Sequence, residues 1–234
     1  MGVLDPLGAA VVLTHHAVDD VDPSCDPRLL VASPAHLEEQ IRLLHKRGYL
    51  FRTAADLLDR GPLRRRQAVL TFDDGFASWV TVVLPLLRQL GVVASFYVCP
   101  GLYGQQHEHV VGAAGRHMSE DDVVTLHAAG MDIGSHTCSH PDLRLLDDDR
   151  LGDELLTSRR RVESLTGQPC RTFAYPYGLY DERVVAATAA AGYELAFRWT
   201  PGRWLPLEAP RLPAPTRHGA RRLALKLAGV RRRA

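Results

Sequence analysis

Short apolar runs alternate with amphipathic segments along most of the chain. The runs at 9–13, 68–72, 92–98, 131–135, 172–175 and 193–197 have the length and composition of strands buried on both faces. Between them, residues 34–47, 80–90, 120–129, 148–165 and 182–191 carry apolar residues at helical spacing, each followed by a glycine stop. This alternation predicts parallel strands joined by crossover helices. Both a (β/α) barrel and a doubly wound sheet satisfy the pattern.

Length and composition favour one folded domain. A chain of 234 residues with 46% hydrophobic and 24% charged residues lies in the globular range, which excludes disordered, fibrous and membrane-embedded classes. We expect a single domain over residues 1–220, followed by a basic tail at 221–234. The start of the chain lacks a basic leader and a long apolar run, so the sequence as written is expected to be cytoplasmic.

Charge and cysteine usage narrow the partners. The chain has 28 basic and 27 acidic residues, without the basic excess of a nucleic-acid-binding protein. Within the basic tail, Leu223, Leu225 and Leu227 recur at a spacing compatible with a helix, so contact with a membrane surface is one hypothesis. The four cysteines show no CxxC spacing, which predicts free thiols rather than disulfides or a cysteine zinc site.

Two adjacent carboxylates end one of the predicted strands. Asp73 and Asp74 follow the apolar run at 68–72 directly, in the sequence TFDDG. Carboxylates at the end of a buried strand are costly unless a cation compensates them. Acidic pairs elsewhere, such as Asp19 and Asp20, lack this position after a buried run.

Two further clusters follow predicted strands, where parallel α/β folds place their active sites. His136 and His140 lie four residues apart in SHTCSH and can share a metal with one carboxylate. Taken alone, this pair is also compatible with local capping or packing. The third cluster is FAYPYG at 173–178, which alone would be an ordinary turn beside aromatic packing.

Together, TFDDG, SHTCSHP and FAYPYG, in this order, resemble the motifs of the polysaccharide deacetylase family, also called carbohydrate esterase family 4 or the NodB homology domain. The FAYPYG variant resembles a subgroup that acts on exopolysaccharide or cell-wall amino sugars. The resemblance extends over residues 11–213. It implies a deformed (β/α) barrel and a divalent metal, most often Zn²⁺ and sometimes Co²⁺ or Ni²⁺. It also implies removal of N-acetyl groups from N-acetylglucosamine-type units of a polysaccharide, oligosaccharide or lipid-linked glycan.

The same resemblance assigns roles to individual residues. Asp74, His136 and His140 match the metal ligands, and Asp73 matches the catalytic base. Tyr177 matches the position whose backbone N–H stabilises the oxyanion. This division suits amide hydrolysis, because a metal polarises the carbonyl and acidifies water while a separate carboxylate takes the proton.

The sequence departs from the family pattern at two points. Ala174 stands where many members have an arginine that orients the base, and Arg171 or Arg211 would have to replace it. A late Leu-x-His motif that supplies the general acid is also missing, which makes His16 the first candidate for that role and His218 the second.

Several substrate contacts and alternatives stay open at this point. Pro176, Trp199 and Arg211 are candidate substrate-binding residues, and Trp204 is a candidate for either sugar stacking or core packing. The loop at 100–117 forms either a rim of the site or a plain connection. Two other functions remain: an inactive glycan-binding module of the same fold, and a deformylase or other amidohydrolase for a small molecule. The glycan and the oligomeric state are not determined by the sequence.

Overall fold

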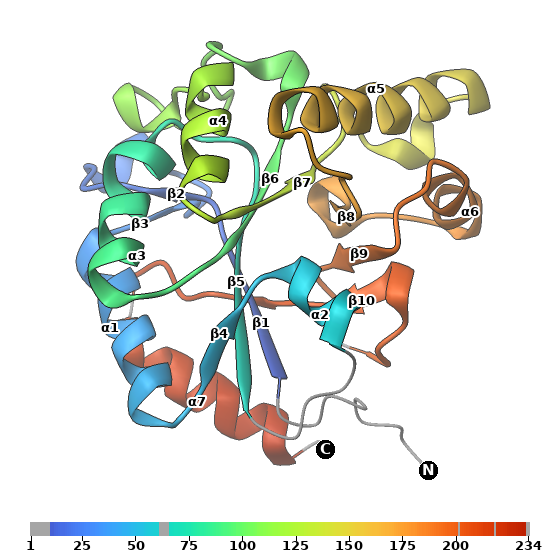
Figure 1. The fold of residues 1–234 in the computed structure, drawn as a ribbon. Coiled ribbons are helices and arrows are strands. Elements are labelled where there is room, and N and C mark those ends of the chain that lie inside the picture. Colours follow the sequence, from blue (N-terminus) through green and yellow to red (C-terminus); the bar gives the residue numbers. More distant parts are fainter. Residues whose placement is uncertain (1–9, 61–65, 201, 218, 233–234) are drawn as a thin grey trace.

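Parallel strands surround a common axis and are themselves surrounded by helices (Figure 1). The computed structural model describes residues 10–60, 66–200, 202–217 and 219–232. Within these residues, the main sheet has the order β10-β9-β8-β7-β6-β5-β1-β11, with β4 paired to β5 beside it. Every one of these strand pairs is parallel. The sheet curls into a nearly closed barrel, so the predicted deformed barrel is confirmed and the doubly wound alternative is wrong.

The elements alternate along the chain. The strands of the barrel are β1 (Ala10–His15), β4 (Leu50–Arg52), β5 (Gln67–Phe72), β6 (Ser95–Val98), β7 (Asp132–Ser135), β8 (Thr172–Ala174), β9 (Leu195–Arg198), β10 (Ala209–Pro210) and β11 (Leu212–Pro213), and β2 (Ala17–Val18) pairs with β3 (Val31–Ala32) apart from it. The helices are α1 (Pro34–Lys46), α2 (Ala54–Arg60), α3 (Leu84–Leu90), α4 (Glu120–Ala128), α5 (Asp148–Thr166), α6 (Glu182–Ala190) and α7 (Gly219–Arg232).

The predicted strands and helices are all present, and their boundaries differ where local chemistry intervenes. The run at 92–98 begins as a strand only at Ser95, because the Val92 N–H bonds to the Leu87 carbonyl and completes the turn that ends α3 at Gly91. The helix expected at 80–90 begins with a wider π turn at Trp79–Val83, next to Pro85, which has no N–H to donate. The short elements β2, β3, β4, α2, β10 and β11 were not predicted, because two to seven residues carry little periodicity.

Side chains along each strand point alternately into the barrel and toward the helices. On β5, Val69 lies in the interior cluster, whereas Leu70 and Phe72 pack in the larger outer core. Ala54 and Leu57 of α2 belong to the interior cluster, so α2 helps to fill the barrel. The Tyr97 ring crosses the interior beside Gly134, where a Cβ would lie 2.4 Å from that ring. Gly134 is therefore required for the tyrosine to occupy this place.

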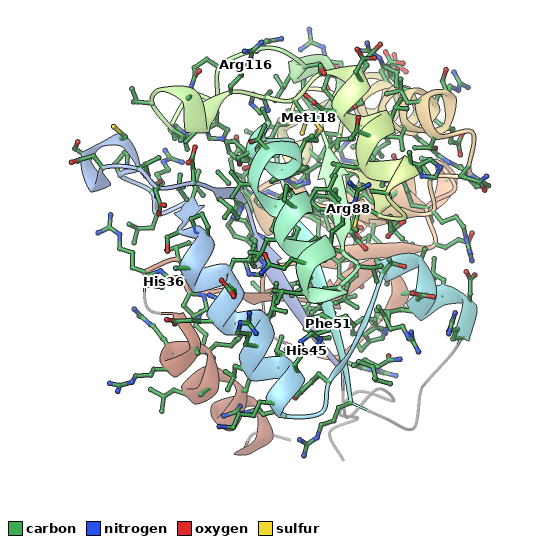
Figure 2. The ribbon with its side chains drawn as sticks, turned by 60° about the vertical axis from the view of Figure 1, so that its left-hand side comes forward. His36, His45, Phe51, Arg88, Arg116 and Met118 are labelled. Atoms are coloured by element: carbon green, nitrogen blue, oxygen red, sulfur yellow. The ribbon has the colours of Figure 1, made fainter. Side chains whose placement is uncertain are left out.

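The C-terminal helix is part of this packing. α7 begins at Gly219, so the boundary expected at residue 220 falls inside a helix. Leu223 and Leu227 are buried, and α7 packs against α1, while Leu225 is 73% exposed. Figure 2 shows α1 beside α7. The His45 ring on α1 contacts the Phe51 ring of β4, with 4.8 Å between the centroids. Among the described residues, no helix is long and apolar enough to cross a membrane.

His15 at the end of β1 is a buried neutral histidine. Its Nε2–H donates to Gln40 Oε1 at 2.9 Å, because the Gln40 amide nitrogen is occupied by the Pro215 carbonyl at 2.7 Å. The ring stacks on Phe72 with 5.0 Å between centroids. Burial lowers the pKa of His15 from 6.5 to about 4, although the hydrogen bond with Gln40 acts in the opposite direction.

This shift predicts a specific acid sensitivity. Because the folded-state pKa lies below the unfolded one, the stability linked to neutral His15 is complete above pH 6.5 and is lost as pH falls toward 4. We expect His15→Gln to remove about 3 kcal/mol from the difference in unfolding free energy between pH 7.5 and pH 4. Urea unfolding at both pH values measures it. An unchanged pH dependence in the variant would contradict this assignment.

Candidate metal centre and active site

The site residues predicted from the motifs meet at the carboxyl ends of the barrel strands. Asp73 and Asp74 follow β5, His136 follows β7, and Tyr177 lies just beyond β8. Parallel strands bring these ends to one rim, so residues far apart in sequence become neighbours. Asp74 has a φ of 83°, unusual for a residue other than glycine, and the chain turns there as it leaves the strand.

Asp74, His136 and His140 form a compact cluster. Asp74 Oδ1 lies 3.3 Å from His136 Nε2 and 3.4 Å from His140 Nε2. One ligand atom from each residue lies within 4.8 Å of the others, close enough to share one ion. The side chains of Asp74, His136 and His140 are 8%, 1% and 17% exposed, so the open side of the cluster is at His140.

The hydrogen bonding of His136 indicates that a cation belongs in this cluster. His136 Nδ1 lies 2.6 Å from the Ala174 carbonyl oxygen, which only accepts, so Nδ1 carries a proton. In the neutral ring, the Nε2 lone pair then faces an Asp74 oxygen that is also rich in electrons. Only a cation between them, either a proton or a metal ion, makes this arrangement favourable. A buried carboxylate with two imidazoles is a common donor set for Zn²⁺, and a carbonyl behind a ligating histidine fixes its tautomer.

The electrostatics of the cluster fit an ionised Asp74. Burial acts to raise the pKa of Asp74, but the adjacent His136 outweighs it and holds the pKa well below its usual value. Burial lowers the pKa of His140 to about 4, so its ring is neutral at physiological pH. Burial also acts to lower the pKa of His136, but the carboxylates of Asp73 and Asp74 outweigh it and raise this pKa, which favours a cation at Nε2. The ionised Asp74 and the neutral His140 are in the protonation states that metal binding requires.

Asp73 is held by a different partner. Arg211 Nη1 donates to Asp73 Oδ1 at 2.7 Å and Nη2 donates to Oδ2 at 2.6 Å, and both side chains are 0% exposed. Arg211 Nη1 also donates to Thr71 Oγ1 at 3.0 Å. Burial acts to raise the pKa of Asp73, but the adjacent guanidinium outweighs it and keeps the pKa below its usual value. Asp73 is therefore ionised and fixed in orientation beside the cluster.

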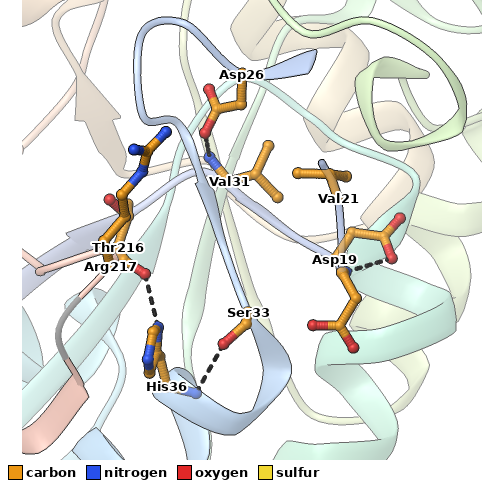
Figure 3. Close-up of a pocket in the computed structure, with 9 residues that line it drawn as sticks. Asp19, Val21, Asp26, Val31, Ser33, His36, Thr216 and Arg217 are labelled. Carbon is orange, nitrogen blue, oxygen red and sulfur yellow. Dashed lines mark hydrogen bonds between the residues drawn. The ribbon is translucent and has the colours of Figure 1, made fainter. Parts of the chain in front are cut away.

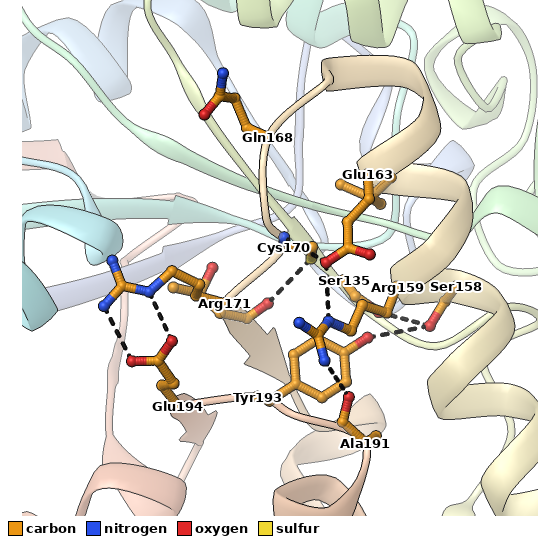
Figure 4. A network of polar contacts seen from close by, with 12 residues as sticks. Ser135, Ser158, Arg159, Glu163, Gln168, Cys170, Arg171, Ala191, Tyr193 and Glu194 are labelled. Atoms are coloured by element: carbon orange, nitrogen blue, oxygen red, sulfur yellow. Dashed lines mark hydrogen bonds and ion pairs between the residues drawn. The ribbon is translucent and has the colours of Figure 1, made fainter.

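Of the two arginines considered as the orienting group, Arg211 occupies the site and Arg171 does not. The Arg171 side chain is 29% exposed and pairs with Glu194 at 2.8 Å (Figure 4). It also pairs with Asp59 at 2.6 Å. Arg211 instead lies inside the barrel, with its guanidinium 5.8 Å from the Tyr97 ring centroid and 5.6 Å from that of Phe197. Its bidentate contact with Asp73 makes it an internal residue, so the prediction that it contacts substrate is not supported.

The other predicted site residues line the rim of the cluster. Tyr177 has a φ of 58° and is 37% exposed. Its ring packs edge-on against the His140 ring, with 4.5 Å between the centroids. His16, directly after β1, makes an edge contact with Trp199, with 5.5 Å between the ring centroids, and it contributes to lowering the pKa of both Asp73 and Asp74. The Trp199 Nε1–H is buried without a partner among the described residues. Pro176, directly before Tyr177, is buried.

Two of the remaining candidates have clear positions. Trp204 packs against the interior cluster and contacts Phe197 at 6.3 Å, which supports the core alternative. The loop at 100–117 reaches the cluster, because His107 Nε2 lies 3.7 Å from Asp74 Oδ2. It is a wall of the site rather than a plain connection. His218, the second candidate for the general acid, lies outside the described residues.

A surface cavity of about 550 Å³ lies beside β2, β3 and the start of α1 (Figure 3). Its lining residues include Asp19, Val31, Ser33 and Arg217. His36 also lines it, and its Nδ1 lies 2.9 Å from the Thr216 carbonyl oxygen. Neither Asp73 nor any member of the Asp74, His136 and His140 cluster lines it. This cavity is therefore separate from the candidate metal centre.

Two residues near the site were not recognised from the sequence. The Thr71 hydroxyl accepts a hydrogen bond from Arg211 Nη1 at 3.0 Å and donates one to the Leu13 carbonyl at 2.9 Å. Glu154 on α5 contacts the loop between the two histidines. Glu154 lay within a predicted helix, and nothing in the helical pattern marked the direction in which it points.

Comparison with known proteins supplies the family. The family model for polysaccharide deacetylase matches residues 60–196, more than half of the chain. YxkH of Bacillus subtilis, a protein named for the same family, is 26% identical over 196 residues, which cover 82% of this chain and 64% of that protein. A chitooligosaccharide deacetylase of Bradyrhizobium sp. is 34% identical over 137 residues, covering 58% of this chain and 56% of that protein. The chain thus spans 56% to 64% of the length of these two relatives.

Solved structures show the same fold. The Streptococcus pyogenes deacetylase PplD in complex with acetate superimposes with a TM-score of 0.79 and 22% identity, covering 92% of this chain and 96% of that chain. A polysaccharide deacetylase from Bacillus cereus gives a TM-score of 0.78 and 24% identity, and the match covers 93% of this chain and 68% of that chain. From the matched model, together with the three motifs at the rim of the barrel, the chain belongs to the polysaccharide deacetylase family.

Proposed function

We propose that this chain is a metal-dependent hydrolase that removes N-acetyl groups from N-acetylglucosamine-type units of a glycan. The observation that carries the proposal is the separation of the two adjacent carboxylates. Asp74 faces His136 and His140, whereas Asp73 faces Arg211. Neighbouring carboxylates with different partners can have different roles, one as a ligand and one as a base.

Asp74, His136 and His140 would hold the ion. A divalent cation bound there would polarise the acetamide carbonyl and increase the acidity of water. Asp73, ionised and outside this set, would receive the proton from the attacking water at a carboxylate oxygen. Arg211 keeps that carboxylate in one orientation, and the Tyr177 N–H would donate to the developing oxyanion.

The departing amine needs a proton, and His16 is our proposed donor. It lies next to Trp199 and close enough for its charge to affect both carboxylates. Trp199 would form part of the wall against which the sugar ring packs, next to His16. Pro176 would stiffen the adjoining turn that carries Tyr177.

The substrate class rests on the relatives. One relative is named for chitooligosaccharides and another, PdaA of Bacillus subtilis, for N-acetylmuramic acid in peptidoglycan, so both names describe N-acetylated amino sugars. The alternative of an inactive glycan-binding module rested on two missing groups, the orienting arginine and the late histidine. Because Arg211, between β10 and β11, makes the contact with Asp73, this alternative loses one of its two supports.

Metal binding is the first property to test. We expect the purified protein to bind one Zn²⁺, and His136→Ala to weaken binding by more than about 100-fold, because it removes a ligand that is itself held by a carbonyl. Chelator competition measures the dissociation constant. His45→Ala, which changes an exposed histidine on α1, is the matched control and should bind as the wild type does. Equal affinity for the wild type and His136→Ala would contradict the proposed site.

A further inference from the structure

The loop that carries both histidines of the cluster has an unusual backbone. Thr137 has a φ of 70° and His140 a φ of 61°. Both lie in the left-handed region of backbone conformation, which residues other than glycine and asparagine seldom adopt. Such residues persist only where surrounding contacts hold them. Some part of the protein must therefore fix the loop, because His136 and His140 share an ion only at one relative placement.

α5 supplies these contacts at the tip of the loop through Glu154. One carboxylate oxygen, Oε2, accepts the Cys138 N–H at 2.7 Å and the Ser139 N–H at 2.9 Å. The other oxygen, Oε1, accepts the Ser139 hydroxyl at 2.5 Å. Three donors from two successive residues thus converge on one ionised side chain. Hydrogen bonds to a charged acceptor are roughly twice as strong as neutral ones.

The same helix holds the other side of the loop. The hydroxyls of Ser158 and Ser135 lie 2.8 Å apart, with Tyr193 beside them (Figure 4). The Tyr193 hydroxyl donates to the Leu155 carbonyl at 3.0 Å. Glu154 and Ser158 are four residues apart on α5 and therefore lie on one face of the helix. They contact the chain immediately before His136 and in the middle of the segment between His136 and His140.

We propose that Glu154 is a positioning residue of the metal centre, which fixes His140 relative to His136 and so sets the affinity for the metal. Glu154 itself contacts neither the three ligands nor the ion. The inference rests on the proposed function, because it assumes that these histidines bind a metal. Cys138 and Ser139 contribute through their backbone N–H groups, so the effect depends on the carboxylate of Glu154 rather than on their side chains alone.

Glu154→Gln tests the proposal because it keeps the shape of the side chain. The amide offers one acceptor oxygen in place of two, and its NH₂ group meets a donor of the loop. We expect the Zn²⁺ dissociation constant to rise by about 10- to 100-fold, as for other groups that orient metal ligands. We also expect an altered visible spectrum of the Co²⁺-substituted protein, which reports the arrangement of the ligands independently of activity.

Glu163→Gln is the matched control. It removes the same charge from the same helix, where Glu163 accepts from Arg159 at 3.0 Å and from the Cys170 N–H at 3.1 Å, away from the loop. We expect its Zn²⁺ affinity and Co²⁺ spectrum to match the wild type. If Glu154→Gln does not fold by circular dichroism, Ser139→Ala removes only the hydroxyl contact and should weaken binding by about 3- to 10-fold.

The outcomes separate this inference from the proposed function. Wild-type affinity and spectrum in folded Glu154→Gln, or equal losses in Glu154→Gln and Glu163→Gln, would overturn the positioning role and leave the metal centre intact. A wild-type protein that binds neither Zn²⁺ nor Co²⁺ would overturn both. A selective loss in Glu154→Gln supports the proposal.

Discussion

Asp73→Asn is expected to lower acetate release by about 10²- to 10⁴-fold while the protein still binds its metal. The reason is the division of the two carboxylates, since Asp73 lies outside the cluster of Asp74, His136 and His140. An amide at this position cannot accept the proton from water. Acetate release and chelator competition, measured on the same preparation, give activity and Zn²⁺ affinity together.

The control for this variant is Asp19→Asn, which changes one carboxylate of a loop pair at the separate surface cavity. It should retain wild-type activity. Asp73→Asn also leaves the Arg211 charge without its partner, so the folded fraction must be checked at the assay temperature. Activity within tenfold of the wild type in folded Asp73→Asn would show that another group acts as the base.

Arg211→Met is expected to lower the free energy of unfolding by about 3 to 5 kcal/mol, because it leaves Asp73 as an unpaired carboxylate inside the barrel. The same change should shift the acid limb of the pH–activity profile upward. In the wild type, the adjacent guanidinium outweighs burial and depresses the pKa of Asp73. Without it, burial raises that pKa, so the base is protonated at a pH where it was previously ionised.

Arg171→Met provides the comparison for this prediction. Its ion pairs are partly exposed, and pairs of this kind contribute about 1 kcal/mol or less. We expect a small loss of stability and an unchanged pH profile. Urea unfolding and the pH dependence of acetate release check both variants. If Arg171→Met shifted the profile and Arg211→Met did not, the assignment of the orienting arginine would be reversed.

Most of the candidate metal centre could be predicted because it depends on where strands end. Asp73, Asp74 and His136 each follow an apolar run directly, and parallel strands place such positions on one rim. The distinct roles proposed for Asp73 and Asp74 came from the family resemblance. The hydrogen bonds from Arg211 to Asp73 give this distinction a physical basis. Which of the two carboxylates faces the histidines is decided by the turn at Asp74, which has no signal in the residue pattern.

The choice between Arg171 and Arg211 required the closure of the barrel. Arg171 lies just before the third motif at 173–178, whereas Arg211 lies far beyond it in the sequence. Arg211 reaches Asp73 because β11 pairs with β1, which in turn pairs with β5. β11 has only two residues, too few to be recognised from periodicity. A long-range contact that depends on so short a strand could not be derived from the sequence.

The contacts of Glu154 and His107 illustrate the same limit for side chains. The helix carrying Glu154 was predicted, but the face it turns toward the histidine loop depends on how α5 packs on β7 and between α4 and α6. His107 lies in a long irregular segment, whose path is set by hydrogen bonds such as that from its own N–H to the Gly115 carbonyl. Neither packing nor loop path has a local pattern in the sequence.

Acetate release from N-acetylglucosamine oligomers, measured before and after removal of the metal, is the decisive test of the proposed metal-dependent deacetylase activity. We expect the wild type to release acetate, with one new free amine for each acetate. Chelation should abolish this release and added Zn²⁺ should restore it. Stoichiometric Zn²⁺ binding without any acetate release from these oligomers or from peptidoglycan would contradict the proposed function, as would release that chelation leaves unchanged.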